Sequence, residues 1–132
     1  MKTNPFNIRP GGSKWLGLKS NCKPFVEFVD TMYGVRAGIV LLRNYIRKGY
    51  DTPAKIISRY APATENNTEN YINFVCKFVG VDRDERIANR LQFVKLCQAV
   101  YKMESGHSIP ESSIVIVISK FKIDLKCVDY GN

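Results

Sequence analysis

The sequence predicts a small, mainly helical domain that carries an ordered N-terminal loop. Its 132 residues are the length of one domain, and 45% hydrophobic with 24% charged residues is typical of a folded chain. Several segments repeat their apolar residues at the 3.6-residue period of a helix. The longest apolar stretches, 39–42 and 114–118, are far shorter than the roughly 20 residues that span a bilayer. The start MKTNPFNIRPGG contains no apolar signal segment, so we expect one soluble domain over residues 1–132 with no membrane span.

The first 48 residues predict a loop, a short extended segment and a helix. Residues 1–24 hold three of the six prolines and three glycines, which favours loop structure. Residues 25–29 alternate partly between apolar and polar side chains, and Asp30 or Thr31 can cap a helix that follows. This helix covers residues 32–48, with Gly49 as its stop signal. Its apolar residues at helical spacing are Val35, Ile39, Leu42 and Ile46.

Three further helices follow, and each has recognisable start or stop signals. The first is opened by Thr52-Pro53 and runs to about Arg59, the second is capped by Thr68 and ended by Gly80, and the third runs from Ile87 or Arg90 to Glu104 before Ser105-Gly106.

The segment after Gly106 has two interpretations. Ser108-Ile-Pro-Glu111 has the form of a capping box, which predicts a fifth helix. The run Ile114–Ile118 consists of β-branched residues, which equally favours a strand. The sequence alone leaves both open.

The charge balance indicates an anionic partner. Twenty Lys and Arg against 12 Asp and Glu give a net charge of +8, which favours nucleic acid, anionic lipid or the acidic polymers of bacterial walls. The basic residues are scattered, whereas dedicated DNA-binding proteins usually gather them in a patch or along one helix. Nucleic acid is therefore the least favoured of these partners.

The cysteines do not predict a metal site. Cys22, Cys76, Cys97 and Cys127 lie far apart, and the single histidine, His107, has no cysteine near it, so zinc-ligand spacing is absent. Cys76 and Cys97 fall within apolar helical segments, where a cysteine is usually a small core residue. We expect no metal and no cofactor.

Glu104 is the carboxylate with the most unusual predicted position. Phe93, Cys97 and Val100 precede it by 11, 7 and 4 residues, so it continues the apolar face of its helix. Burial there would raise the pKa of a carboxyl group, as a general acid for glycosidic bonds requires. The alternative is a fraying helix end at which the side chain turns to solvent.

Two other segments are candidates for sugar binding. Residues 60–71 are rich in hydroxyl, amide and carboxyl groups between two helices, although they also suit a plain capping loop. Residues 4–9 carry amides and are followed by Trp15, whose ring can stack on a sugar or instead cover the core.

The opening Asn4-Pro5-Phe6-Asn7-Ile8-Arg9 resembles the N-P-G-N-I-R opening of a family of small phage and prophage proteins. These proteins are often labelled virion structural proteins and are lysozyme-like. The resemblance covers roughly residues 4–106, with phenylalanine at position 6 and tyrosine at position 60 where glycine and tryptophan are usual. It continues through Lys14-Trp15-x-Gly17, Phe25-x-x-Phe28, Tyr33-Gly34-Val35-Arg36-Ala37, Leu41-Leu42-x-x-Tyr45, the block Ile56–Pro62 and Glu65-Asn66-x-Thr68-x-x-Tyr71.

The same motifs are similar, in a different order, to those of peptidoglycan glucosaminidases and lytic transglycosylases. In those enzymes a helix ends in a catalytic glutamate, and a segment like N-L-F-G-I-K follows it. Here the Asn4–Arg9 segment comes first and Glu104-Ser105-Gly106 comes last, which implies a circularly permuted lysozyme-like fold. The resemblance implies catalytic roles for Glu104 and Glu65. It also implies substrate contacts from Asn4, Phe6, Asn7, Trp15, Tyr60, Thr68 and Tyr71.

The sequence thus predicts a phage-associated enzyme that cleaves the β-1,4 bond between N-acetylmuramic acid and N-acetylglucosamine. Its expected partner is bacterial peptidoglycan, with other virion proteins as further partners. Its expected location is the virion, or the host cytoplasm before release. The alternative is a non-catalytic virion structural or wall-binding module with the same fold.

Overall fold

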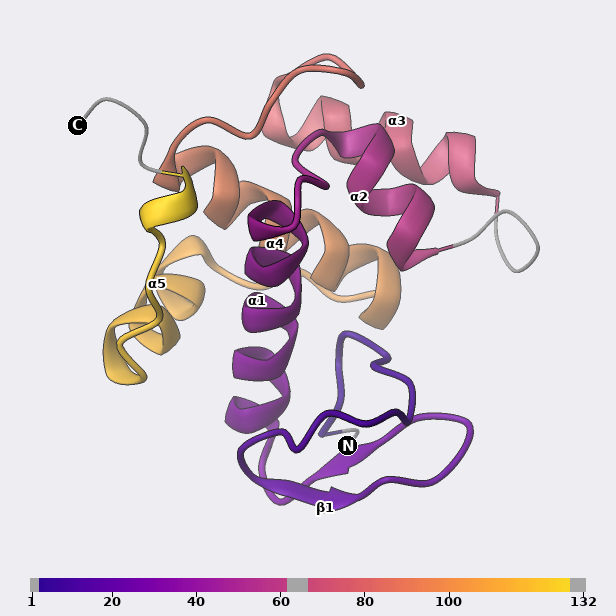
Figure 1. Ribbon diagram of the computed structural model, residues 1–132, viewed down its shortest axis with the longest axis vertical. Coiled ribbons are helices and arrows are strands. Elements are labelled where there is room, and N and C mark those ends of the chain that lie inside the picture. Colours follow the sequence, from indigo (N-terminus) through magenta and orange to yellow (C-terminus); the bar gives the residue numbers. More distant parts are fainter. Residues whose placement is uncertain (1–2, 62–66, 129–132) are drawn as a thin grey trace.

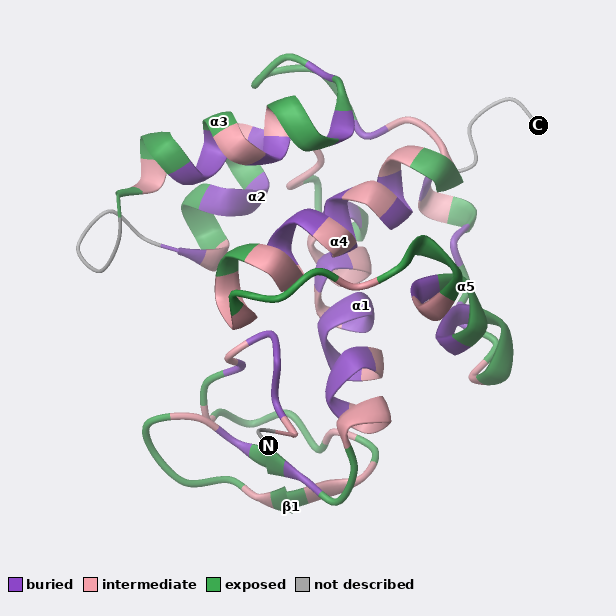
Figure 2. Ribbon diagram, turned by 180° about the vertical axis from the view of Figure 1, so that it is seen from behind, coloured by how far each residue is buried: buried purple, intermediate pink, exposed green. Residues whose placement is uncertain are grey.

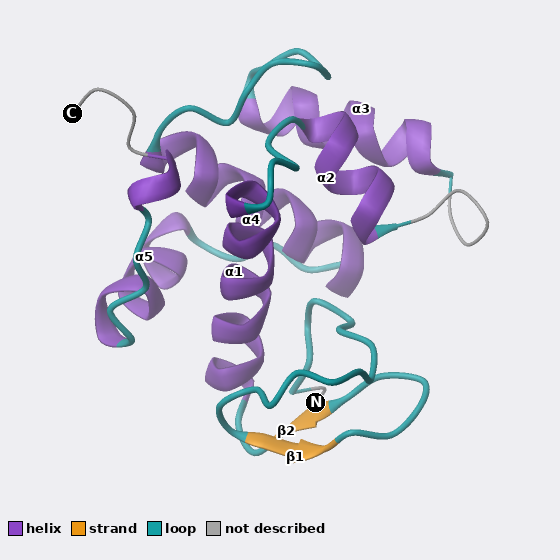
Figure 3. Ribbon diagram, in the orientation of Figure 1, coloured by secondary structure: helices purple, strands orange, loops and turns teal. Residues whose placement is uncertain are grey.

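The computed structural model describes residues 3–61 and 67–128, and most of these residues are helical (Figures 1 and 3). The mainly helical class predicted from the sequence is confirmed. In chain order the elements are β1 (Leu18–Ser20), β2 (Glu27–Phe28), α1 (Thr31–Arg47), α2 (Pro53–Tyr60), α3 (Thr68–Val79), α4 (Arg90–Ser105), α5 (Glu111–Lys120) and the 3-10 turn η1 (Lys126–Val128).

The helix boundaries follow local signals in the sequence. The Asp30 side chain accepts a hydrogen bond from the backbone N–H of Met32, and Thr52 caps α2 in the same way, ahead of a proline in its first turn. Gly80 and Gly106 adopt left-handed backbone angles that end α3 and α4, with φ values of 85° and 78°. These boundaries agree with the predicted ones to within a residue or two.

The predicted cap of α3 is wrong by one residue. The Asn67 side chain accepts the hydrogen bond from Asn70 N–H, so Asn67 is the N-cap and Thr68 is the first helical residue. The Thr68 hydroxyl instead donates to the carbonyl oxygen of Ala61, at 2.8 Å. It therefore ties the start of α3 to the end of α2.

The β-branched run after Pro110 is helical, so its interpretation as a strand is wrong. Ile114, Val117 and Ile118 are spaced for one helical face and are buried, and α5 packs against α1 and α4. This burial outweighs the local β preference of the run. The predicted capping box also does not form, because Pro110 occupies the N-cap position and makes no side-chain cap.

The helices pack around α1 and α4. α4 contacts α3 on one side and α5 on the other, while α1 runs from the two-stranded ribbon into the helical layer (Figures 1 and 2). The inner face of α4 is fully buried and includes Phe93, Leu96 and Cys97, so Cys97 is a core residue as predicted, whereas Cys76 is only partly buried. Within the described ranges, no helix combines the length and apolar character that a bilayer crossing needs.

The N-terminal loop is seated on α1 at two glycines. Gly34 and Gly38 lie one turn apart, and a methyl group on either would overlap the loop: at Gly34 the carbonyl oxygen of Thr3, at Gly38 the ring of Phe6. The Phe6 ring is completely buried there and meets Tyr101 of α4 edge to face. The loop is therefore part of the core.

The buried Asn4 amide fixes the path of this loop. Its Nδ2 donates to the carbonyl oxygens of Ile8 and Val26, at 2.9 and 2.8 Å, and its Oδ1 accepts from Ile8 N–H at 3.0 Å. A buried amide with these partners is satisfied, and it links the loop to the segment that enters β2.

We predict that Gly38→Ala destabilises the protein by about 1–3 kcal/mol, because the added methyl group must displace the Phe6 ring in a filled core. Urea denaturation measures the change in the free energy of unfolding. Gly12→Ala is the control, since a methyl group at Gly12 meets nothing within 4 Å. Equal stability of the two variants would contradict this seating of the loop.

Candidate functional site

Glu104 lies in the last turn of α4 and is partly buried. Its Oε2 accepts a hydrogen bond from the Tyr71 hydroxyl of α3 at 2.9 Å, and its Oε1 accepts one from the Asn7 amide at 3.1 Å. The carboxyl group is therefore held between a helix and the N-terminal loop. The alternative interpretation from the sequence was a fraying helix end with the Glu104 side chain turned to solvent. The structure instead holds this side chain in one position by hydrogen bonds.

Asn7 reaches Glu104 because its backbone takes a left-handed conformation. Its φ is 54°, in the region that asparagine tolerates better than most residues. Its N–H donates to the Asn4 carbonyl oxygen, which closes a tight turn. The Asn7 Nδ2 also donates to the main-chain oxygen of Glu104 at 3.0 Å, so one amide binds both the side chain and the backbone of the same residue.

Two tyrosines beside Glu104 are held in their neutral form. Burial, and next the nearby Glu104 carboxylate, raise the pKa of the Tyr71 hydroxyl well above its usual range. Burial likewise raises the pKa of Tyr60, again with Glu104 as the second cause. The Tyr60 hydroxyl donates to the carbonyl oxygen of Phe6. Both tyrosines therefore act as hydrogen-bond donors that position Glu104 or the loop.

The Glu104 side chain lines a hollow of about 320 Å³, here called the Glu104 hollow. This volume is at the lower end of the range for small-molecule sites. Of the described residues that line it, Glu104 is the only carboxylate. The other polar residues that line it are Asn4, Asn7, Thr31, Tyr101, Ser105 and His107.

A second depression, here called the Trp15 hollow, adjoins the first at Asn7, which lines both. Its walls include Trp15, Tyr45, Arg59 and Tyr60. Aromatic rings and a guanidinium group thus flank the site that carries the carboxyl group.

The structure brings together five of the predicted site residues. Asn7 and Tyr71 are bonded to Glu104, while Trp15 and Tyr60 line the adjoining hollow. Thr68 lines neither hollow, because its hydroxyl is used between α2 and α3. Glu65 lies outside the described residues.

The predicted substrate contact of Phe6 needs correction, whereas that of Asn4, which lines the Glu104 hollow, stays a prediction. Phe6 has no exposed surface, since its ring fills the space above Gly38. Asn4 is 5% exposed and its amide is bound to the backbone of the loop and the β2 approach. Both residues position the loop that carries Asn7.

Several residues of the two hollows were not among those predicted from the sequence. His107 was considered only as a metal ligand, yet it lies in the Glu104 hollow with Thr31 and Tyr101. Its place immediately after Gly106, which ends α4, is the signal that could have linked it to Glu104. Tyr45 and Arg59 had no such signal, because they come from separate helices that meet only in the fold.

We predict that Tyr71→Phe lowers the free energy of unfolding by about 1–2 kcal/mol at pH 7, through loss of the hydrogen bond to Glu104. Above pH 10, the ordinary pKa of tyrosine, the unfolded chain loses the Tyr71 proton while the native protein keeps it. Native stability therefore falls as pH rises, by up to about 1.4 kcal/mol per pH unit for each such group.

The variant lacks this contribution, so its stability gap to the wild type should narrow above pH 10. Urea denaturation from pH 7 to 11 measures the gap. The other groups whose pKa is raised, such as Tyr60 and Cys97, are present in both proteins and cancel. A gap that stays constant with pH would contradict the neutral, buried state of Tyr71.

Comparison with known proteins relates the chain to a bacteriophage protein. No family model matches the sequence. Protein P5 of Pseudoalteromonas phage PM2 is 38% identical over 109 residues, which cover 78% of this chain and 68% of the phage protein. With this identity over more than two thirds of both sequences, the chain belongs to the family of phage protein P5.

Proposed function

We propose that the protein is a phage-associated enzyme that cleaves the β-1,4 bond between N-acetylmuramic acid and N-acetylglucosamine in peptidoglycan. The observation that carries the proposal is the Glu104 carboxyl group, held by Asn7 and Tyr71 at the wall of a hollow. The aromatic Trp15 hollow beside it suits a saccharide chain. The net charge of +8 suits an acidic wall polymer.

In this mechanism Glu104 is the general acid. It donates its proton to the glycosidic oxygen as the bond from that oxygen to C1 of the muramic acid breaks. Among the described residues, no second carboxylate lines the Glu104 hollow, so in this mechanism the C6 hydroxyl of the same sugar attacks C1. The Glu104 carboxylate then takes the hydroxyl proton, and the product is a 1,6-anhydro sugar.

A hydrolytic route requires a second carboxylate. If Glu65 activates a water molecule on the opposite face of the sugar, the product is an ordinary reducing end. The separation of the two carboxyl groups would determine which route applies.

We also propose that the fold is a circularly permuted version of the lysozyme-like arrangement. In the enzymes that the sequence resembles, the N-L-F-G-I-K segment follows the catalytic glutamate along the chain. Here Asn7, from the similar segment, hydrogen-bonds Glu104 although it precedes that residue by 97 positions. This contact restores in space the proximity that those enzymes have in sequence.

The second candidate is a virion structural or wall-binding module without catalysis. Both carboxylate oxygens of Glu104 already accept hydrogen bonds from the protein, as in a group whose task is to tie a loop to two helices. The phage origin of the related protein supports virion association under either proposal.

We predict that the wild-type protein clears a suspension of purified peptidoglycan and that Glu104→Gln is at least 100-fold slower, because general acid catalysis contributes about 10²–10⁴ in rate. Turbidity measures the rate, and mass spectrometry identifies the fragments. Anhydro-muropeptides indicate a transglycosylase, whereas reducing ends indicate a hydrolase.

Glu111→Gln is the matched control, since Glu111 is an exposed glutamate in the first turn of α5 and lines neither hollow. It should clear the suspension at the wild-type rate. Equal clearance by Glu104→Gln and wild type would move the acid to another residue. A folded wild type that binds peptidoglycan but releases no fragments would favour the structural module.

A further inference from the structure

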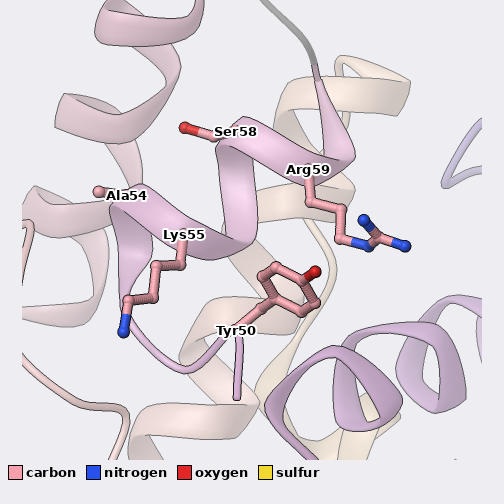
Figure 4. A pocket seen from close by; sticks show the side chains of 5 residues that line it. All are labelled: Tyr50, Ala54, Lys55, Ser58 and Arg59. Atoms are coloured by element: carbon pink, nitrogen blue, oxygen red, sulfur yellow. The ribbon is translucent and has the colours of Figure 1, made fainter. Parts of the chain in front are cut away.

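Arg59 lies where the Trp15 hollow meets a third depression on the surface of α2. This depression is lined by Tyr50, Ala54, Lys55, Ser58 and Arg59, and Figure 4 shows the Arg59 side chain reaching toward the Tyr50 ring while Lys55 extends away from it. Asn7 joins the Glu104 hollow to the Trp15 hollow, and Arg59 joins the Trp15 hollow to this third one. The Trp15 hollow therefore shares one lining residue with each of the other two depressions.

The Arg59 guanidinium is held by aromatic rings. Its central carbon lies 4.7 Å from the centre of the Tyr50 ring and 5.8 Å from that of Tyr45. Such contacts restrict the side chain and leave the N–H edge of the guanidinium plane able to bind an anion. Arg59 is exposed, so that edge is accessible from solvent.

Three other cations near α2 are paired with carboxylates. Lys55 and Arg86 both pair with Asp51, and Arg83 pairs with Glu69. Among the described residues, no carboxylate forms an ion pair with Arg59. The positive charge of Arg59 therefore has no carboxylate partner among the described residues, whereas the Lys55 ammonium lies 3.9 Å from Asp51.

We infer that Arg59 binds a carboxylate of the peptidoglycan strand whose sugars occupy the adjoining hollows. The inference rests on the proposed function, because the Glu104 site supplies the neighbouring sugar. Muramic acid and its attached peptide carry carboxylates, whereas a chain of N-acetylglucosamine alone does not. A planar, stacked guanidinium fits the two oxygens of a carboxylate, so Arg59 selects an anionic strand over a neutral one.

The test measures binding without cleavage. The full chain carrying Glu104→Gln is sedimented with purified Gram-negative peptidoglycan, which lacks phosphate-rich wall polymers, either native or with its carboxylates amidated. Adding Arg59→Gln to this variant should weaken binding to native peptidoglycan about tenfold, because one charge-assisted hydrogen-bond contact is lost. Amidation should weaken binding of the Arg59 form by a similar factor and should leave the Arg59→Gln form unchanged.

Lys55→Gln is the matched control, because Lys55 lies one turn away on α2 and is paired with Asp51. It should lower binding less than twofold. Arg59→Lys should be intermediate, since it keeps the charge and loses the planar group, and circular dichroism verifies that each variant is folded.

The inference would be overturned if Arg59→Gln left binding unchanged, if it weakened binding equally on native and amidated material, or if Lys55→Gln weakened binding as much as Arg59→Gln. Absence of binding by any folded form would overturn it as well. The proposed enzyme activity is tested separately by fragment release. A protein that binds through Arg59 but releases no fragments would refute the enzyme and support the carboxylate site.

Discussion

The contact on which the rest of the structure depends is the seating of Phe6 over Gly38. The two glycines of α1 let the N-terminal loop approach the helix backbone, and the Phe6 ring fills the resulting space against Tyr101. The Asn4 amide then fixes the loop by hydrogen bonds to Ile8 and Val26. Because the loop cannot shift without disturbing these contacts, Asn7 is held where its amide meets Glu104.

Most of the helical structure could be predicted because its signals are local. Thr52-Pro53 opens α2 and Gly80 closes α3 through backbone geometry that involves only neighbouring residues. The segment that became α5 has weaker local signals, because its β-branched residues favour a strand and its helix lacks a side-chain cap. Its state is decided by burial of Ile114 and Ile118 beside α1 and α4, which sequence pattern alone does not reveal.

Part of the site was also predictable from local sequence signals. Helical periodicity placed Glu104 on the inner side of α4, and its hydrogen bonds to Asn7 and Tyr71 agree with that placement. The error at Phe6 arose because a glycine 32 positions later supplies the space that the ring fills. The sequence shows an aromatic residue next to an amide, but it does not show that the ring turns inward.

The arrangement around Glu104 also limits where a proton can go. Tyr71 and Tyr60 have raised pKa values and donate hydrogen bonds, so neither readily loses its proton near neutral pH. The Asn7 amide does not ionise and cannot take up the proton. Under the proposed function, a proton that Glu104 donates therefore goes to the ligand in the Glu104 hollow rather than to these three neighbours. In the proposed mechanism, the contacts that fix the position of Glu104 thus also direct its proton toward the bound sugar.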